Sequence, residues 1–371
     1  MCKRNLLLLI ALTCGMVLVG CGKKDDETAP VEAEVTPIIE VSDNTAPVEE
    51  VVEEPVEEET REGMYRSELT NEWIDESLKD QRPIAAMVDN EKTALPHYGL
   101  SKADVVYEIT NSTLNDGVTR FMVMVKDWEK IEQLGSIRSV RPTNLQIAPE
   151  WNAVVCHDGG PFYIDMFLAN DFVENFSGTF SRVNNGKARE FTEYILPGDL
   201  DKNFKSKGYS VSYNKYYTGP HYQFASEANP VDLSSNSDAK ACTRVDMPFK
   251  HNKPVLEYNE SDGLYYYSEY GTDHVDPGNS NAKLAFKNLL IQNARYEKFD
   301  EHGYMMFYSV DADREGLYIT NGQAIPVTWS KIDDLNPTRY YDKDGKEITI
   351  NTGKTYVAMV PDDIYANLKI Q

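Results

Sequence analysis

The distribution of apolar positions divides the 371-residue chain into three regions. Residues 5–20 form a nearly continuous apolar run, residues 22–63 contain no aromatic residue, and apolar runs bounded by turn residues begin at about residue 80. Since a chain needs apolar surface to offset the entropy of ordering, we expect the folded part to begin near residue 64.

The first region has the pattern of a secretory signal peptide. Lys3 and Arg4 precede the apolar run, and small residues precede Cys21. The ending Leu18–Cys21 is typical of a bacterial lipoprotein signal, in which Cys21 becomes the lipidated first residue. The alternative is an uncleaved membrane anchor, but the run is shorter than the ~20 residues that a spanning helix needs. We therefore predict a signal peptide over residues 1–21 and a lipid anchor on the extracytoplasmic face of the cell membrane.

The second region, residues 22–63, predicts a disordered acidic linker. It contains fifteen acidic residues against Lys23, Lys24 and Arg61, a net charge of −12. Such a composition lacks the apolar mass for a core and is extended by its own charge. We interpret it as a solvated spacer; a docking motif is the alternative.

The apolar runs of residues 64–230 predict an α/β domain. They are continuous rather than alternating, which is typical of strands that are covered on both faces. Helical segments are expected at 142–148, 161–172 and 196–207. The predicted strands are Pro83–Val88, Ala103–Ile109, Thr119–Val125 and Trp151–Cys156.

Residues 240–371 have a different pattern, with short tyrosine-rich runs separated by turns such as Asn321-Gly322 and Asp344-Gly345. This predicts a mostly antiparallel β domain. Residues 281–290 fit either a helix or a strand. The predicted fold class is thus α+β, with an N-terminal α/β domain followed by a β-rich domain.

Charge and cysteine content narrow the function. Removing the +2 of the signal peptide and the −12 of the linker from the total of −23 leaves −13 on the folded part, which argues against nucleic acid as a partner. Only Cys156 and Cys242 remain after the signal peptide and Cys21, and the sequence leaves open whether they form a disulfide or are two buried thiols. With no Cys-x-x-Cys or His-x-x-x-His pair, we expect neither a structural zinc site nor another cofactor.

Several segments resemble the YerB-like lipoproteins of Gram-positive bacteria, a family without known function. The resemblance runs in order through about residues 80–361 and implies a lipid anchor and a two-part folded body, but no activity. It is carried by Arg82–Asn90, Gly99–Glu108, Gly117–Phe121, Gly135–Pro142, His157–Gly160, Trp329–Lys331, Pro337–Asp342 and Gly353–Pro361. One stretch departs from the family: Gly186–Glu193 lacks the proline, histidine and asparagine of an Arg-Lys-Ala-Pro-His-Asn-like pattern.

The segment from His157 to Pro161 is the first candidate site. A predicted strand ends in His157, Asp158, Gly159 and Gly160, and Pro161 suits the first position of a helix, where free N–H groups receive an anion. The alternative is that the two glycines only permit a tight turn.

Three arginines strengthen the case for an anion site. Arg120, Arg138 and Arg141 lie near predicted strand ends and could form a guanidinium clamp for phosphate or carboxylate. Alternatively, they form structural ion pairs, with Glu108 among the candidate acids. Our hypothesis is that the arginines and the Gly159-Gly160 turn converge on one site.

Two functions from different classes follow. The favoured one is a non-catalytic binding module for a cell-wall polymer or an envelope protein. The alternative is a hydrolase or transferase that acts on wall glycan or anionic polymer through His157, Asp158 and Glu108, although no nucleophile motif such as Gly-x-Ser-x-Gly is present. Turnover that depends on His157 would distinguish the second function from the first.

Overall fold

The computed structural model describes residues 60–371. The predicted signal peptide with Cys21, and the predicted linker up to residue 59, lie outside the described residues. Among residues 60–371, no helix is both long enough and apolar enough to cross a membrane.

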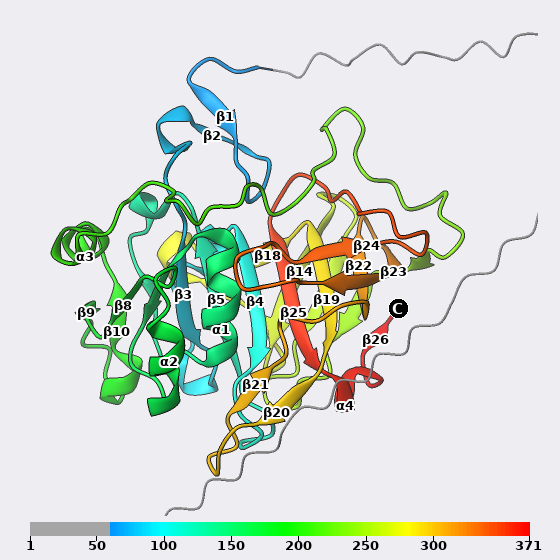
Figure 1. Ribbon diagram of the computed structural model, residues 1–371. Helices are drawn as coiled ribbons and strands as arrows, with labels where there is room; N and C mark the ends of the chain where they lie inside the picture. Colours follow the sequence, from blue (N-terminus) through cyan, green and yellow to red (C-terminus); the bar gives the residue numbers. More distant parts are fainter. Residues whose placement is uncertain (1–59) are drawn as a thin grey trace, which may run out of the picture. The chain divides into compact units, whose positions relative to one another are not determined.

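A mixed eleven-stranded sheet forms the centre of the fold (Figure 1). Its strand order is β11-β23-β22-β19-β25-β4-β5-β3-β7-β8, with β24 paired to β23. The bounds are β3 Ile84–Asp89, β4 Val105–Thr110, β5 Thr119–Val125, β7 Val154–His157, β8 Asn175–Ser177, β11 Lys240–Ala241, β19 Asn288–Ala294, β22 Arg314–Thr320, β23 Gln323–Ser330, β24 Arg339–Tyr341 and β25 Thr355–Pro361.

The two halves of the sequence share this sheet. Strand β25 lies between β19 and β4, and it pairs in parallel with both. The register with β4 runs from Val105 opposite Thr355 to Ile109 opposite Met359. The boundary placed between residues 230 and 240 falls in a segment without helix or strand, and the domain limits stay a prediction.

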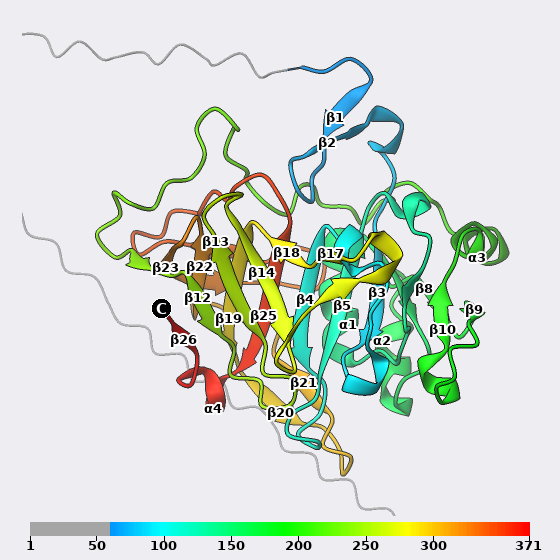
Figure 2. The ribbon, with the colours of Figure 1, turned by 180° about the vertical axis from the view of Figure 1, so that it is seen from behind.

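A second sheet covers one face of the central sheet (Figure 2). Its order is β15-β14-β13-β12-β26, with β18 paired to β14. Apolar side chains of β14, such as Tyr265 and Tyr267, pack in one core with Val106, Phe121 and Tyr356 of the central sheet. The bounds are β12 Arg244–Asp246, β13 Val255–Asn259, β14 Leu264–Glu269, β15 Thr272–Asp273, β18 Ala285–Phe286 and β26 Lys369–Ile370.

Short helices and loops cover the opposite face (Figure 1). There Leu145 of α1 (Pro142–Ile147) packs with Tyr107, Met122 and Trp329 in a second core. The remaining elements are α2 Asp165–Leu168, α3 Asp199–Lys207, α4 Asp362–Tyr365, β1 Met64–Arg66, β2 Trp73–Asp75, β6 Leu134–Gly135, β9 Ser181–Arg182, β10 Glu193–Ile195, β16 Val275–Asp276, β17 Ala282–Lys283, β20 Tyr296–Lys298 and β21 Met305–Phe307.

The chain is mostly β, so the predicted α/β character of residues 64–230 is present only in part. The four predicted strands are confirmed, and β3, β4, β5 and β7 are buried along their whole length. The ambiguous stretch 281–290 is strand rather than helix.

The helix predicted over 161–172 was wrong in its extent. A 3-10 turn (Phe162–Ile164) leads into the four residues of α2, and the Asn170 amide donates to Phe167 O at 3.0 Å where the helix has ended. The predicted helix at 196–207 begins later, at Asp199, because Gly198 adopts a left-handed conformation with φ of 82°.

Successive residues of each strand face opposite cores, as pleating requires. Cys156 therefore belongs to the core beneath the second sheet, whereas its neighbours on β7, Val155 and His157, face the other way. Cys156 and Cys242 are both free and buried, so they form no disulfide.

A buried ion pair joins the two halves on the helix-covered face. Lys331 Nζ lies 2.8 Å from Glu150 Oε2, and neither side chain is exposed. The other carboxylate oxygen of Glu150 accepts from the Tyr107 hydroxyl at 3.1 Å and lies 3.1 Å from His221 Nε2. Thr338 adds two donors at 2.9 Å. Burial alone would raise the pKa of Glu150, but the charges of Lys331 and His221 hold it well below its usual value.

The first prediction concerns the loss of this ion pair. In Glu150→Gln the Lys331 ammonium stays buried without a counter-charge, so we expect the free energy of unfolding to fall by about 3–5 kcal/mol. Urea denaturation of the whole chain measures this. The control is Lys343→Gln, which removes an exposed pair with Asp344 and should cost less than about 1 kcal/mol. Equal effects of the two substitutions would contradict the prediction.

The second prediction concerns pH. Because the pKa of Glu150 is lower in the folded chain than the ~4.3 of an unfolded glutamate, its stabilisation is complete above that value and declines as pH falls toward the folded pKa. We expect the wild-type chain to lose more stability than Glu150→Gln between about pH 5 and pH 3. Denaturation curves that decline in parallel for both proteins would count against this role of Glu150.

Candidate functional site

The predicted arginine clamp is organised around a buried acid, Asp89, at the end of β3. Arg138 Nε lies 2.5 Å and Arg120 Nη2 lies 3.8 Å from Asp89 Oδ2. The Glu91 N–H donates to the other oxygen at 2.9 Å. Burial by itself would raise the pKa of Asp89, but the charges of Arg120 and Arg138 bring it below its usual value.

Two of the three arginines are thus held by structural ion pairs. Arg120 lies directly opposite Asp89 in the antiparallel pairing of β5 with β3, and it also donates to Ser139 O at 2.9 Å. Arg138 binds Glu190 as well, at 3.0 Å. The acids considered from the sequence did not include Asp89, because its partnership depends on a strand register that the sequence does not reveal.

Arg141 differs from the other two arginines. Its side chain is only 6% exposed, and its guanidinium lies over the Tyr304 ring, 3.9 Å from the ring centre. One nitrogen donates to Val140 O at 2.9 Å, and within residues 60–371 no carboxylate pairs with it. Burial and the neighbouring positive charge of Arg120 lower the pKa of Arg141 to about 9. A buried cation without an acidic partner is the feature expected of an anion site.

Arg141 lines a pocket of about 360 Å³ together with Gly160 of the glycine turn. Asp300 also lines it, but Asp300 already accepts from the Tyr163 hydroxyl at 3.1 Å and, within its own loop, from the Tyr304 N–H at 3.2 Å. The structure therefore brings Arg141 and Gly160 together and leaves Arg120, Arg138 and Gly159 outside the lining. The lining residues are Ser139, Arg141, Gly160, Pro161, Phe162, Asp300, Glu301, His302 and Tyr304.

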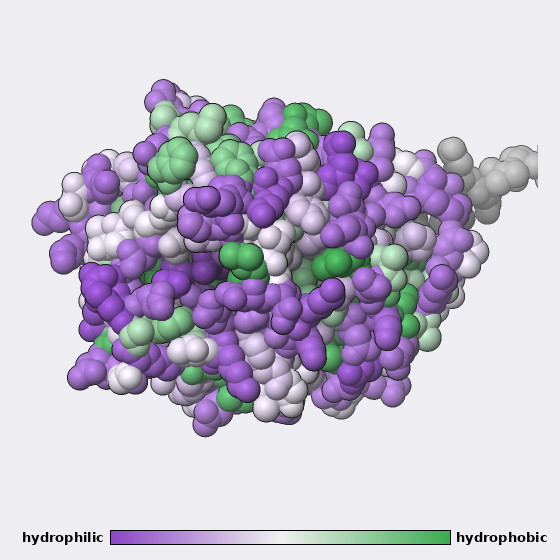
Figure 3. Space-filling model, turned by 90° about the horizontal axis from the view of Figure 1, so that it is seen from below, coloured by the Kyte–Doolittle hydropathy of each residue, from purple (hydrophilic) through white to green (hydrophobic). Residues whose placement is uncertain are grey.

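Four residues of the loop between β20 and β21 line the pocket. This loop projects from one end of the fold (Figure 1). Seen from that end, the surface is mainly hydrophilic, with apolar residues in small separate groups (Figure 3). Phe162, at the rim of the pocket, is 86% exposed. The helix start expected at Pro161 is too short for a helix-terminal anion site, so the side chain of Arg141 is what defines the pocket.

His157 and Asp158 have structural partners. The His157 ring is buried, with Nδ1 2.8 Å from Gly159 O and Nε2 3.2 Å from Asn175 Oδ1. Burial lowers the pKa of His157. Asp158 is bound by Arg182 at 2.9 Å, and Arg182 also binds the buried Glu193 at 2.5 Å.

Glu108 lies on the opposite face of the central sheet, in a closed polar network. Its Oε1 accepts from Thr119 at 2.8 Å and from Asn252 at 2.7 Å, and its Oε2 accepts from the hydroxyls of Tyr267 at 3.0 Å and Tyr356 at 2.6 Å. Burial raises the pKa of Glu108 against the lowering effect of these donors.

The residues predicted to carry a hydrolytic function, His157, Asp158 and Glu108, do not lie together in one site. Glu108 is on β4 and His157 is on β7, with β5 and β3 between them, so the strands are roughly 14 Å apart at ~4.8 Å per strand spacing. The two side chains also face opposite cores. Chemistry that needs both groups on one substrate therefore has no geometric support.

Three further residues, absent from the sequence predictions, lie beside the Glu108 network. His97, Glu269 and His274 are buried and bring their ligand atoms within 4.8 Å of one another. Within residues 60–371 they are the one group of histidine, cysteine and acidic side chains close enough to hold a metal ion. No short sequence motif indicates this group, because His97 and His274 are 177 residues apart in the sequence.

The stretch that departs from the family pattern has a packing role. Lys187 Nζ donates to Ala94 O at 3.0 Å and to Leu95 O at 2.7 Å, which ties the stretch to the loop that carries His97.

The third prediction compares how much two acids that pair with Arg138, the buried Asp89 and the exposed Glu190, contribute to stability. Asp89→Ala leaves Arg120 buried without its counter-charge and should lower the free energy of unfolding by about 3–5 kcal/mol. The matched control is Glu190→Ala, which removes the 51% exposed partner of Arg138 and should cost about 1 kcal/mol or less. Chemical denaturation measures both. A cost for Asp89→Ala as small as the control's would refute the structural role of Asp89.

Comparison with known proteins gives matches in both halves of the chain. Residues 69–210 match the N-terminal domain of a protein family of unknown function, DUF3048, and residues 245–357 match its C-terminal domain. Together these matches cover more than half of the chain.

One similar relative is the Bacillus subtilis (strain 168) protein named "Putative lipoprotein YerB". It is 26% identical over 308 residues, which are 80% of this chain and 86% of the relative. The crystal structure of the YerB protein from Bacillus subtilis has the same fold, with a TM-score of 0.69 at 22% identity over 83% of this chain and 99% of that one. The matching domains, the relative and the shared fold place the chain in the YerB-like family, whose two-part body has no assigned function.

Proposed function

We propose that this protein is a lipid-anchored, extracytoplasmic binding module that recognises an anionic group of an envelope polymer through the Arg141 pocket. The lipid anchor at Cys21 rests on the signal pattern, and the name of the relative supports it. The acidic linker would hold the folded part clear of the lipid headgroups.

The single observation that carries the binding role is the state of Arg141. A guanidinium that is almost fully buried loses hydration, and here the loss is offset by one carbonyl and one aromatic face rather than by a carboxylate. An incoming phosphate or carboxylate would supply the missing charge and could accept two parallel hydrogen bonds. Arg120 lies close enough to lower the pKa of Arg141, so its charge adds to the attraction.

The surroundings of the pocket favour a polymer over a free ion. The exposed Phe162 ring at the rim offers a rigid apolar surface beside the cation, which suits a ligand with apolar and anionic groups in alternation. The net charge of −13 on the folded part would repel most anions at long range. A polymer with many repeated groups compensates for weak single contacts.

The fourth prediction tests this function with the whole chain purified in detergent. We expect purified cell-wall sacculi to retain the protein, and retention to disappear when their anionic polymers are stripped. Arg141→Gln should weaken retention about tenfold, because a charge-assisted hydrogen bond is lost.

The control is Arg295→Gln. Arg295 also lies over a tyrosine ring, but it is half exposed and already paired with Asp311 at 2.9 Å, so retention should not change. Retention that survives either the stripping of the polymers or Arg141→Gln would reject the anionic-polymer role. It would then direct attention to a protein partner in the envelope.

A further inference from the structure

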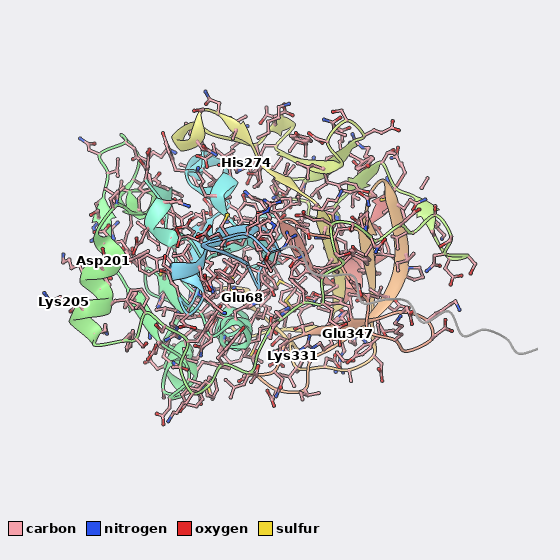
Figure 4. The ribbon with its side chains drawn as sticks, turned by 90° about the horizontal axis from the view of Figure 1, so that it is seen from above. Glu68, Asp201, Lys205, His274, Lys331 and Glu347 are labelled. Carbon is pink, nitrogen blue, oxygen red and sulfur yellow. The ribbon has the colours of Figure 1, made fainter. Side chains whose placement is uncertain are left out.

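Three buried side chains from both family domains meet on the face of the central sheet opposite to the Arg141 pocket. His97 comes from the loop before the 3-10 turn Leu100–Lys102, and Glu269 ends β14. His274, labelled in Figure 4, lies between β15 and β16. His97 falls within the match to the N-terminal family domain, and Glu269 and His274 fall within the C-terminal one.

Their ligand atoms point at one another. His97 Nδ1 lies 2.8 Å from His274 Nε2, and Glu269 Oε1 lies 3.8 Å from the first nitrogen and 3.9 Å from the second. A tetrahedral zinc ion with bonds of ~2.0–2.1 Å holds its ligand atoms about 3.3 Å apart. Shifts of about half an ångström in each separation would therefore produce the spacing that such an ion requires.

Hydrogen bonding fixes which nitrogen of His97 is available. Its Nε2 is 2.6 Å from the backbone oxygen of Asp89, and a carbonyl can only accept, so Nε2 carries the proton. In the neutral ring Nδ1 then presents its lone pair toward His274. His97 thus has the arrangement of a metal-binding histidine, which donates its second N–H to a carbonyl or carboxylate, whereas Nδ1 of His274 has no hydrogen-bond partner among the described residues.

Glu269 provides an independent sign of a missing partner. Its Oε1 is buried and accepts no hydrogen bond from the described part of the chain. Its Oε2 accepts from the Asn252 amide at 3.1 Å, and the same amide donates to Glu108. One oxygen is thus oriented by the Glu108 network while the other is left facing the two imidazoles. A buried acceptor without a donor is costly, and two buried carboxylates beside each other repel.

We propose that His97 Nδ1, His274 Nε2 and Glu269 Oε1 bind one divalent transition-metal ion, with Zn²⁺ the preferred ion. Two imidazoles and a carboxylate suit zinc, whereas Ca²⁺ and Mg²⁺ require oxygen ligands throughout. A water molecule would complete the tetrahedral set. Because the three side chains are almost completely buried, the ion has a structural role, which is to fasten the N-terminal family domain to the C-terminal one.

The test measures the metal content of the whole chain in detergent after loading with Zn²⁺ and removal of free metal. We expect about one zinc ion per wild-type chain and less than a tenth of that in Glu269→Gln, which keeps the side-chain shape. The matched control is His251→Gln, a histidine outside the cluster whose Nδ1 contacts Asn115 O, and it should bind as the wild type does. Equal zinc content in wild type and Glu269→Gln would overturn the proposal.

A thermal experiment covers the case in which a variant folds poorly. Zinc should raise the melting temperature of the chelator-treated wild type by roughly 5 °C at a free concentration 100 times the dissociation constant, and it should not move that of Glu269→Gln. In the absence of metal, Glu269→Gln should be at least as stable as the wild type, because a neutral amide replaces a carboxyl that faces Glu108.

Cobalt gives a readout that needs no variant. Co²⁺ bound to the wild type should produce the visible absorption of a four-coordinate site, and added Zn²⁺ should abolish it. The proposal is overturned if the wild-type chain takes up neither ion and its melting temperature changes with neither zinc nor chelator. In that case a proton rather than a metal joins these three side chains.

Discussion

The parallel pairing of β4 with β25 is the constraint on which the rest of the structure depends. It joins residues about 250 positions apart, Val105 opposite Thr355 through Ile109 opposite Met359, and it makes one sheet from the two family domains. Bringing such distant segments together has an entropic cost that local contacts cannot offset. Burial of both strands on both faces supplies the compensating free energy.

Polar groups on both sides of this pair fix how the strands meet. On one face, Glu108 of β4 accepts a hydrogen bond from Tyr356 of β25; on the other, the hydroxyl of Tyr107 reaches Glu150, which pairs with Lys331 from the second half of the chain. A shift of one residue in register would turn each buried polar side chain into the wrong core. The buried charges thus specify the alignment, at a desolvation cost that their partners must offset.

The sequence predicts what depends on local pattern. Continuous apolar runs located β3, β4, β5 and β7, and the resemblance in Gly99–Glu108 and Gly353–Pro361 covered the two strands that later proved to be neighbours. The predicted anion site stays a prediction: Arg141 and Gly160 line one pocket, whereas Arg120, Arg138 and Gly159 do not line it. Residue patterns could not supply strand order, so Asp89 was missed as the partner of Arg120 and Arg138. The helix expected after Pro161 is short: Tyr163 packs against Phe299 of the loop after β20, while Phe162 is exposed.

Strand pleating places the two proposed sites on opposite faces of the central sheet. Arg120, Asp89 and the Arg141 pocket lie on the helix-covered side of the central sheet, whereas His97 packs edge-on against Phe121 in the core beneath the second sheet. The Arg141 pocket is open and lined by loops, a location suited to ligand exchange. The His97, His274 and Glu269 cluster is closed and built where the family domains touch, a location suited to cohesion. Asp89 is the one residue that connects them, since its carboxylate binds the arginines while its backbone oxygen orients His97.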